Sequence, residues 1–193
     1  MGCGASAMEN MELNTWGHKM IDRYDEIFQE LEQIDAENGL PEKLFLAISM
    51  LMPIPNIDLL IQNQEGKILL SWRDDEYFGK GWHIPGGCIR FKETMLERVM
   101  ETARIELHTE VEINPEPLAI RDVIVGKNEP MPKVRTHHLA VLFECKLPDG
   151  YQIDNQGLSE GDAGYLKWFE KIPDNILKVH DCYKDIFERK TIL

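Results

Sequence analysis

Residues 82–108, WHIPGGCIRFKETMLERVMETARIELH, decide the fold of this chain. They predict a strand, a turn at Pro85-Gly86-Gly87 and a helix, because the residues from Thr94 to Leu107 carry apolar side chains at every fourth position: Met95, Val99, Ala103 and Leu107. Glycine lets the backbone turn where a Cβ would clash, and the turn leaves carbonyl oxygens free to face a ligand. Glu106 lies at the far end of the helix. The pattern therefore joins a tight turn to a helix that bears a carboxylate.

The same stretch resembles the signature of the Nudix hydrolases, which act on nucleoside diphosphates linked to another group. Gly87, Glu93 and Glu106 match the signature at its spacing. Other signature positions hold different residues: Glu101 replaces Arg, Thr102 and Ile105 replace Glu, and His108 replaces Gly. The resemblance implies an α+β fold, in which a mixed β-sheet is sandwiched between helices.

Within that family, the order of elements from Leu44 to Phe187 is most similar to the GDP-mannose mannosyl hydrolase branch, which also carries an incomplete signature. The similar segments are a first strand with an Asp, a second strand that ends in a basic residue, a later strand, and a final strand and helix: Ile57–Ile61, Leu69–Arg73, Thr136–Val141, Leu166–Phe169 and Val179–His180. We therefore expect a Nudix domain over residues 44–193 and a helical extension over residues 1–43.

The extension carries apolar side chains at helical spacing, which predict a one-sided amphipathic helix: Trp16, Met20, Tyr24, Ile27, Phe28, Leu31 and Ile34. This helix either covers an edge of the domain, or forms a dimer contact or a wall of the substrate pocket. Met1-Gly2-Cys3 begins a myristoylation pattern, so we expect membrane attachment only if Gly2 is acylated. Met8 and Met11 are alternative starts.

Composition limits the classes of function. The chain has 193 residues, with 34 acidic against 21 basic side chains and a net charge of −13, which argues against duplex nucleic acid as a partner. No apolar run approaches the roughly 20 residues of a membrane span. The four cysteines form no CxxC pair, so neither a zinc site nor a disulfide scaffold is indicated, and a reducing cytoplasm fits best. We expect a cytoplasmic homodimer with a small-molecule substrate.

The resemblance implies a metal site at the turn. Family members gather helix carboxylates around a cluster of Mg²⁺ ions, but Thr102 and Ile105 leave only Glu106 here. We therefore expect a single Mg²⁺, bound by Glu106 and the Gly86 carbonyl, since Mg²⁺ prefers oxygen ligands. A solvated helix carboxylate is the alternative for Glu106. Glu93 is expected to orient the turn or the start of the helix.

The branch places a Gln-His pair, metal ligand and base, in the loop before its last strand. The counterpart here, residues 157–164, contains no histidine, so we expect Glu160 or Asp162 to bind the metal or to accept a proton from water. A solvated acidic loop is an equally good interpretation. Asp58 matches a residue of the branch that assists catalysis; the alternative is that an inward-facing Asp on this strand only caps a turn.

Three further residues are candidates for binding the substrate. Arg73 ends the second strand and could stabilise a diphosphate, or could be a surface charge. His137 and His138 are neighbours on a predicted strand, so one of them should point inward, where it could bind the substrate or be satisfied by core residues.

The expected activity is Mg²⁺-dependent hydrolysis of a nucleoside diphosphate sugar similar to GDP-mannose. In that branch water attacks the glycosyl carbon and releases the sugar and an intact nucleoside diphosphate. One alternative is a pyrophosphatase that cleaves between phosphates and takes its missing ligands from Glu160 or Asp162. The other is a catalytically silent nucleotide-binding domain, which Thr102 and Ile105 favour because they stand at family Glu positions.

Overall fold

The computed structural model describes residues 23–126 and 134–190. Gly2, Cys3, Trp16 and Met20, on which the expectations for the N-terminus depend, lie outside these ranges. The chain divides into two units, residues 1–40 and residues 41–193. In the first unit, residues 23–31 are helical, as the apolar spacing predicts, and Ile34 lies beyond the end of this helix.

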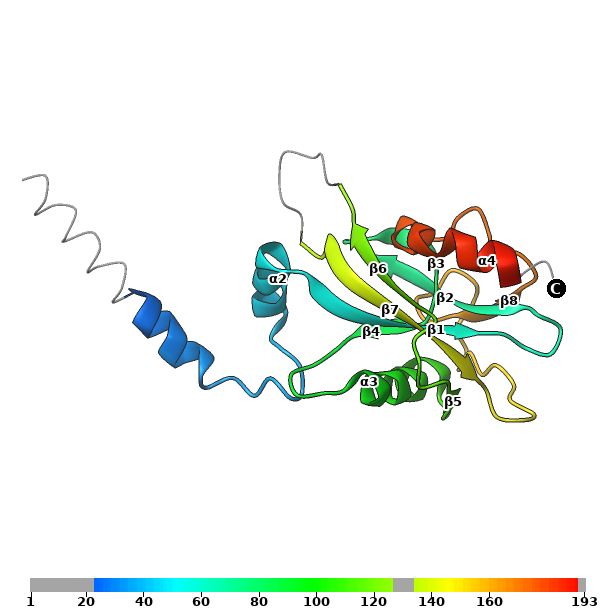
Figure 1. Ribbon diagram of the computed structural model, residues 1–193, viewed down its shortest axis with the longest axis horizontal. Coiled ribbons are helices and arrows are strands. Elements are labelled where there is room, and N and C mark those ends of the chain that lie inside the picture. The colour runs from blue at the N-terminus through cyan, green and yellow to red at the C-terminus, as the bar shows by residue number, and fades with distance from the viewer. Residues whose placement is uncertain (1–22, 127–133, 191–193) are drawn as a thin grey trace, which may run out of the picture. The chain divides into compact units, whose positions relative to one another are not determined.

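The larger unit contains a five-stranded and a three-stranded sheet (Figure 1). In the five-stranded sheet, β1 (Ile54–Ile61) pairs in parallel with β7 (His137–Lys146) and antiparallel with β4 (Gly86–Cys88). Strand β7 also pairs with β5 (Glu112–Ile113) and β6 (Ala119–Ile124). In the three-stranded sheet, β2 (Ile68–Asp75) lies between β3 (Gly79–His83) and β8 (Leu166–Phe169).

Helices cover both sides of this strand layer. On one side lies α3 (Met95–Thr102), which continues into the π-helical turn η1 (Ala103–Leu107). On the other side lie the 3₁₀ helix η2 (Lys178–Tyr183) and α4 (Lys184–Lys190), while α2 (Glu42–Leu51) precedes β1 (Figure 1). This arrangement confirms the predicted α+β sandwich. Within the described ranges, no helix combines the length and apolarity needed to cross a membrane.

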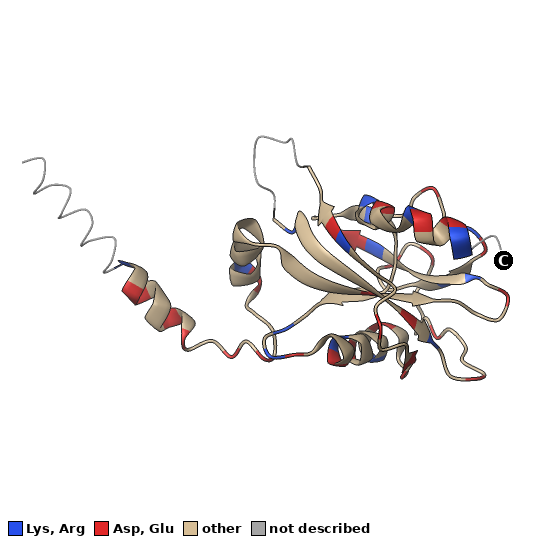
Figure 2. Ribbon diagram, viewed as in Figure 1, with Lys and Arg blue, Asp and Glu red and all other residues tan. Residues whose placement is uncertain are grey.

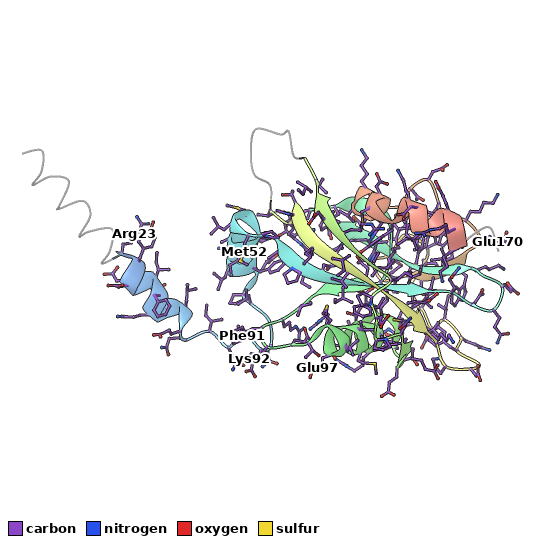
Figure 3. The ribbon with its side chains drawn as sticks, in the orientation of Figure 1. Arg23, Met52, Phe91, Lys92, Glu97 and Glu170 are labelled. Carbon is purple, nitrogen blue, oxygen red and sulfur yellow. The ribbon has the colours of Figure 1, made fainter. Side chains whose placement is uncertain are left out.

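Two apolar clusters hold the helices against the strands. Consecutive residues of a strand point to opposite faces, so Leu59 joins the cluster on the α3 side and Leu60 the cluster on the α4 side. Figure 3 shows side chains filling both layers, whereas the exposed Glu97 and Glu170 lie at the periphery. Charged residues gather on the helices and connections, and β1 and β7 are mostly uncharged (Figure 2). The apolar strands are thus buried between helices whose outer faces are polar.

The helix predicted from Thr94 to Leu107 forms, but as two kinds of helix. Thr94 is its N-cap: the Thr94 hydroxyl accepts a hydrogen bond from the Glu97 N–H at 3.2 Å, and the Glu97 carboxylate accepts one from the Thr94 N–H at 2.8 Å. The α-helical pattern ends at Thr102, and the wider η1 turn carries Glu106. Fourfold apolar spacing cannot distinguish these two helical forms. The wider turn therefore sets the position of Glu106.

Candidate active site

Two carboxylates flank the turn at Gly86. Strands β1 and β4 place Asp58 opposite Gly86, and the Gly86 N–H donates a hydrogen bond to Glu106 Oε1 at 3.2 Å. A Cβ at Gly86 would come within 2.6 Å of both Asp58 Oδ1 and the Ile57 carbonyl oxygen. Glycine is therefore required for the close packing of this turn on Asp58.

Asp58 is buried and held by two hydrogen bonds. Asn56 Nδ2 donates to Oδ1 at 3.0 Å, and the Tyr183 hydroxyl of η2 donates to Oδ2 at 2.8 Å. Burial raises the pKa of Asp58 to about 7, although both hydrogen bonds and the charge of Arg73 act to lower it. At neutral pH this carboxyl group can therefore both accept and donate a proton.

Glu106 is half-buried and also has a perturbed pKa. Burial raises the pKa of Glu106 to about 7, while the Gly86 N–H and Arg73 oppose the rise and Asp58 adds to it. Among the described residues, Oε1 has Gly86 as its partner and Oε2 accepts no hydrogen bond. Glu106 therefore has one oxygen available to a ligand.

The two signature positions that lack Glu contribute no charge to this turn. Thr102 is buried, its hydroxyl has no partner within residues 23–126 and 134–190, and it lies 3.2 Å from the position of a Cβ built on Gly87. Ile105 is exposed. Thr102 therefore packs against the glycine turn, where the family has a charged side chain.

A cavity opens beside Asp58 and gathers charged and polar side chains from β2, β3, β7, η2 and the connection before β7. Among its lining residues are Asp58, Arg73, His83, Arg135, His138 and His180. Five residues of this site were not predicted from the sequence: the cavity residues His83, Arg135 and His180, and the two residues that hold Asp58, Asn56 and Tyr183. No motif marks them, because they reach the cavity from distant parts of the chain.

Two arginines face this cavity. Arg73 forms an ion pair with Asp75, and its guanidinium lies 4.8 Å from the centroid of the Phe78 ring. The Arg135 guanidinium lies against three aromatic rings, at 5.5 Å from Phe45 and 5.3 Å from Tyr77 and Phe78, and its buried Nε has no hydrogen-bond partner in the described part of the chain. A guanidinium beside aromatic rings remains positively charged, which suits an anionic ligand.

The structure separates the two neighbouring histidines of β7. His138 is buried and lines the cavity, whereas His137 is half-buried and is absent from the cavity lining. Burial lowers the pKa of His138 to about 4, and the charge of Arg135 lowers it further. His138 is therefore neutral at physiological pH.

Glu160 and Asp162 lie on the exposed loop before β8 and are absent from the cavity lining. Glu160 pairs with Lys167 at 3.0 Å, and Asp162 Oδ2 accepts a hydrogen bond from the Ser159 N–H at 2.8 Å. The Gly164 N–H donates to the Trp72 carbonyl at 2.8 Å and ties the loop to β2. The structure therefore does not bring these two acids into the group formed by Asp58, Glu106 and Arg73.

Glu93 holds the loop that leads from β4 into α3. Its carboxylate binds the buried Arg98 through two hydrogen bonds, of 2.8 and 2.6 Å, and also accepts the Arg90 N–H at 2.8 Å. Arg98 is only 5% exposed. Glu93 thus occupies the orienting position that the sequence analysis assigns to it.

The residues at Gly86 fit a divalent cation that is shared with a substrate. The described part of the chain has no cluster of three or more His, Cys, Asp or Glu ready to enclose a metal. Mg²⁺ at phosphate-binding sites commonly uses one or two carboxylates and takes its other ligands from phosphate and water. Glu106, with a free oxygen, and the Gly86 carbonyl match this mode of binding.

Comparison with known proteins agrees with this fold. The sequence profile of the NUDIX domain matches residues 52–171, more than half of the chain. The low-salt glycan biosynthesis protein Agl8 of Haloferax volcanii is 29% identical over 118 residues, which cover 61% of this chain and 74% of that protein.

Solved structures agree as well. A MutT NUDIX hydrolase from Burkholderia pseudomallei superposes with a TM-score of 0.53 at 19% identity, over 73% of this chain and 97% of that one. A protein from Jonesia denitrificans, described as a possible asymmetric diadenosine tetraphosphate hydrolase, superposes with a TM-score of 0.51 at 13% identity. The match covers 74% of this chain and 94% of that one. At these identities the likeness shows the fold alone.

Proposed function

Because this chain belongs to the NUDIX domain family of hydrolases, whose members generally use divalent cations, we propose that it hydrolyses a nucleoside diphosphate sugar with Mg²⁺. The observation that carries the proposal is the pair of carboxyl groups at Gly86, both with a pKa of about 7, beside a cavity that contains two arginines. The Haloferax relative is named for glycan biosynthesis, which favours a sugar-bearing substrate.

The charged residues of the site have separate roles in the proposed reaction. Arg73 and Arg135 bind the diphosphate, because guanidinium groups match phosphate oxygens in geometry and charge. Glu106 and the Gly86 carbonyl would hold the cation, which would help to neutralise the diphosphate. Asp58, fixed by Asn56 and Tyr183, accepts a proton from the attacking water, since a base with a pKa near the working pH is effective.

We place the attack at the glycosyl carbon. The bond between that carbon and the diphosphate oxygen breaks, water supplies the new hydroxyl of the sugar, and the nucleoside diphosphate leaves with the bonding electrons. Negative charge then develops on the diphosphate, where Arg73 and Arg135 can stabilise it. Of the signature carboxylates that bind metal in the family, the helix keeps only Glu106. Such a carboxylate-poor helix is easier to reconcile with attack at carbon than with attack at phosphorus.

A turnover screen tests the proposal. Purified protein is assayed with Mg²⁺ against GDP-, UDP- and ADP-linked sugars, and the best substrate is then hydrolysed in ¹⁸O water. We expect label in the released sugar. Label in a nucleotide phosphate would reject attack at carbon and favour a pyrophosphatase, although its expected ligands Glu160 and Asp162 are engaged elsewhere.

A silent nucleotide-binding domain is the second candidate, favoured by Thr102 and Ile105 at signature Glu positions. Measurable binding of the same sugar nucleotides without any product, at every Mg²⁺ concentration, would support it against the hydrolase.

We also propose a reducing cytoplasm as the working compartment. Cys88, Cys145 and Cys182 are free thiols in the structure. The expected homodimer remains a prediction, which light scattering on the purified chain would test.

A further inference from the structure

Two histidines of the cavity have no part in the mechanism above. His83 ends β3 and His180 lies in η2, yet their rings stack with centroids 6.3 Å apart and planes inclined by 17°. Both line the cavity, and His180 is only 6% exposed. What this stacked pair can offer to a ligand depends on which nitrogen atom of each imidazole carries the proton.

The backbone of Ile84 contacts both rings and determines the tautomer of each. The Ile84 N–H donates to His180 Nε2 at 3.3 Å, so this nitrogen holds a lone pair and the proton of the neutral ring is on Nδ1. The Ile84 carbonyl can only accept, and His83 Nδ1 lies 2.8 Å from it, so this Nδ1 carries the proton and Nε2 holds the lone pair. One backbone residue therefore fixes the same tautomer in both rings.

The two rings nevertheless offer opposite groups to a ligand. His180 Nδ1 is buried and has no hydrogen-bond partner among the described residues, so it is a free N–H donor. His83 Nε2 accepts no hydrogen bond from the described residues, so it is a free acceptor. Buried polar groups are normally paired, and an unpaired donor on a residue that lines a cavity indicates a group that a ligand satisfies.

Both rings are uncharged at neutral pH. Burial lowers the pKa of His83 to about 4 and that of His180 to about 3, and the positive charge of Arg73 acts in the same direction. The cavity therefore combines two cationic side chains, Arg73 and Arg135, with two neutral imidazole rings, those of His83 and His180.

We propose that His83 and His180 form a subsite for the hydroxyl groups of the sugar, with His180 Nδ1–H as donor and His83 Nε2 as acceptor. A sugar hydroxyl donates and accepts at once and so satisfies both rings, whereas an ionised phosphate has no proton to give to His83. The inference rests on the proposed function, because the arginines are taken to hold the diphosphate to which the sugar is attached. It adds the residues that recognise the sugar.

Two substitutions separate these groups from the packing of the rings. In His180→Gln, the amide oxygen can still accept the Ile84 N–H while the Nδ1 donor is lost. In His83→Asn, the amide can still donate to the Ile84 carbonyl while the Nε2 acceptor is lost. His108→Asn is the control, because His108 is exposed at the end of η1 in the left-handed region, with φ of 55°, which Asn tolerates.

Binding is measured by calorimetry without metal, so that turnover plays no part. GDP-mannose, UDP-glucose and ADP-glucose are each compared with the corresponding nucleoside diphosphate. We expect one sugar nucleotide to bind more tightly than its diphosphate, and each histidine variant to lose about 3- to 10-fold in affinity for that sugar nucleotide alone, the range for one net hydrogen bond. His108→Asn should match the wild type.

Three outcomes overturn the subsite: no gain in affinity from any sugar, equal losses for sugar nucleotide and diphosphate, or unchanged binding in both histidine variants. Equal losses would place the ribose or the base against the histidines. Long-range ¹H–¹⁵N NMR gives a check that needs no ligand, since a proton on Nε2 of either ring would also overturn the assignment. Failure of the proposed function appears separately, as absence of turnover with Mg²⁺ in the wild type.

Discussion

A methyl side chain at position 86 would disturb the arrangement of the site. Its N–H binds Glu106, and its α-carbon leaves no room for a side chain because Asp58 Oδ1 and the Ile57 carbonyl lie 2.6 Å from an added Cβ. The two carboxyl groups therefore keep their relative position only while residue 86 is glycine.

Gly86→Ala should lower kcat/KM by about 100-fold, the loss expected when a catalytic group shifts by about 1 Å. It should also lower the free energy of unfolding by about 1–3 kcal/mol, through overpacking. Steady-state assays and urea unfolding measure the two effects. Gly66→Ala is the control, since φ there is +77° and a Cβ meets nothing within 4 Å, so it should cost about 1 kcal/mol of stability and leave kcat/KM unchanged. Wild-type activity in Gly86→Ala would remove Asp58 and Glu106 from the mechanism.

The hydroxyl of Tyr183 tunes the pKa of Asp58. It donates to Oδ2 at 2.8 Å and thereby lowers the pKa of Asp58 against the effect of burial. Burial and the neighbouring Asp58 raise the pKa of Tyr183 itself, so this hydroxyl keeps its proton across the working range. Tyr183 therefore stabilises the ionised form of the base.

Tyr183→Phe should move the acid limb of the kcat/KM pH profile to higher pH. The sign follows from the lost hydrogen bond: without it the pKa of Asp58 rises above about 7, and a smaller fraction of the base is ionised at any pH below that value. Tyr151→Phe removes a comparable hydroxyl, which donates to the Leu107 carbonyl at 3.1 Å outside the cavity, and should leave the limb in place. A shift to lower pH, or no shift, in Tyr183→Phe would show that Asp58 is not the base.

The segment from β4 to α3 positions the site through a buried ion pair. Arg98 and Glu93 connect the helix to the loop before it, and their carboxylate–guanidinium contact is 2.6 Å with side-chain exposures of 6% and 15%. Burial tends to raise the pKa of Glu93, but its bonds to Arg98 and to the Arg90 N–H lower it below its usual value, so the pair stays ionised.

Arg98→Met should destabilise the fold by about 3–5 kcal/mol, because it leaves Glu93 charged and partly buried without its partner. The double variant Glu93→Gln with Arg98→Met should recover part of this loss. Arg104→Ala removes the exposed partner of Glu101 and should cost less than about 0.5 kcal/mol. Urea unfolding of the four proteins measures the series. Equal losses in Arg98→Met and Arg104→Ala would mean that the buried pair has no structural role.

The elements differ in how far their sequence predicts them. Helix α3 repeats its apolar residues at helical spacing, which encodes the face that is buried. Strands β1 and β2 are instead predicted from the resemblance, because their apolar residues form continuous runs. The turn at Gly86 and the roles of Glu93 and Glu106 follow from the resemblance in one short stretch. Asp58 and Tyr183 are 125 residues apart, and no local pattern connects them. Arg135 and His180 were missed for the same reason, since their roles arise from packing between distant elements.

At the scale of the whole molecule, a net charge of −13 surrounds a cavity with two arginines. An anionic substrate is repelled by the overall charge and attracted by Arg73 and Arg135, so the arginines and the cation must supply the local attraction. Exposed acidic groups are screened by salt more strongly than the buried cavity is. The acidic exterior thus disfavours extended polyanions, which is consistent with the small diphosphate substrate that we propose.

The division of the chain at Leu40 leads to a test of the extension. Both apolar clusters and all the cavity residues come from positions after Pro41. We therefore expect residues 41–193 to fold alone, with a Tm within about 3 °C of the full chain, because 1 kcal/mol shifts Tm by about 2–4 °C in a domain of this size. Its kcat/KM should also match that of the full chain, and scanning calorimetry and assays compare the two.

Light scattering on the same samples determines whether the expected dimer depends on the extension. An unchanged Tm with a loss of activity would instead identify the extension as a wall of the substrate pocket, and a large fall in Tm would show that it belongs to the folded core.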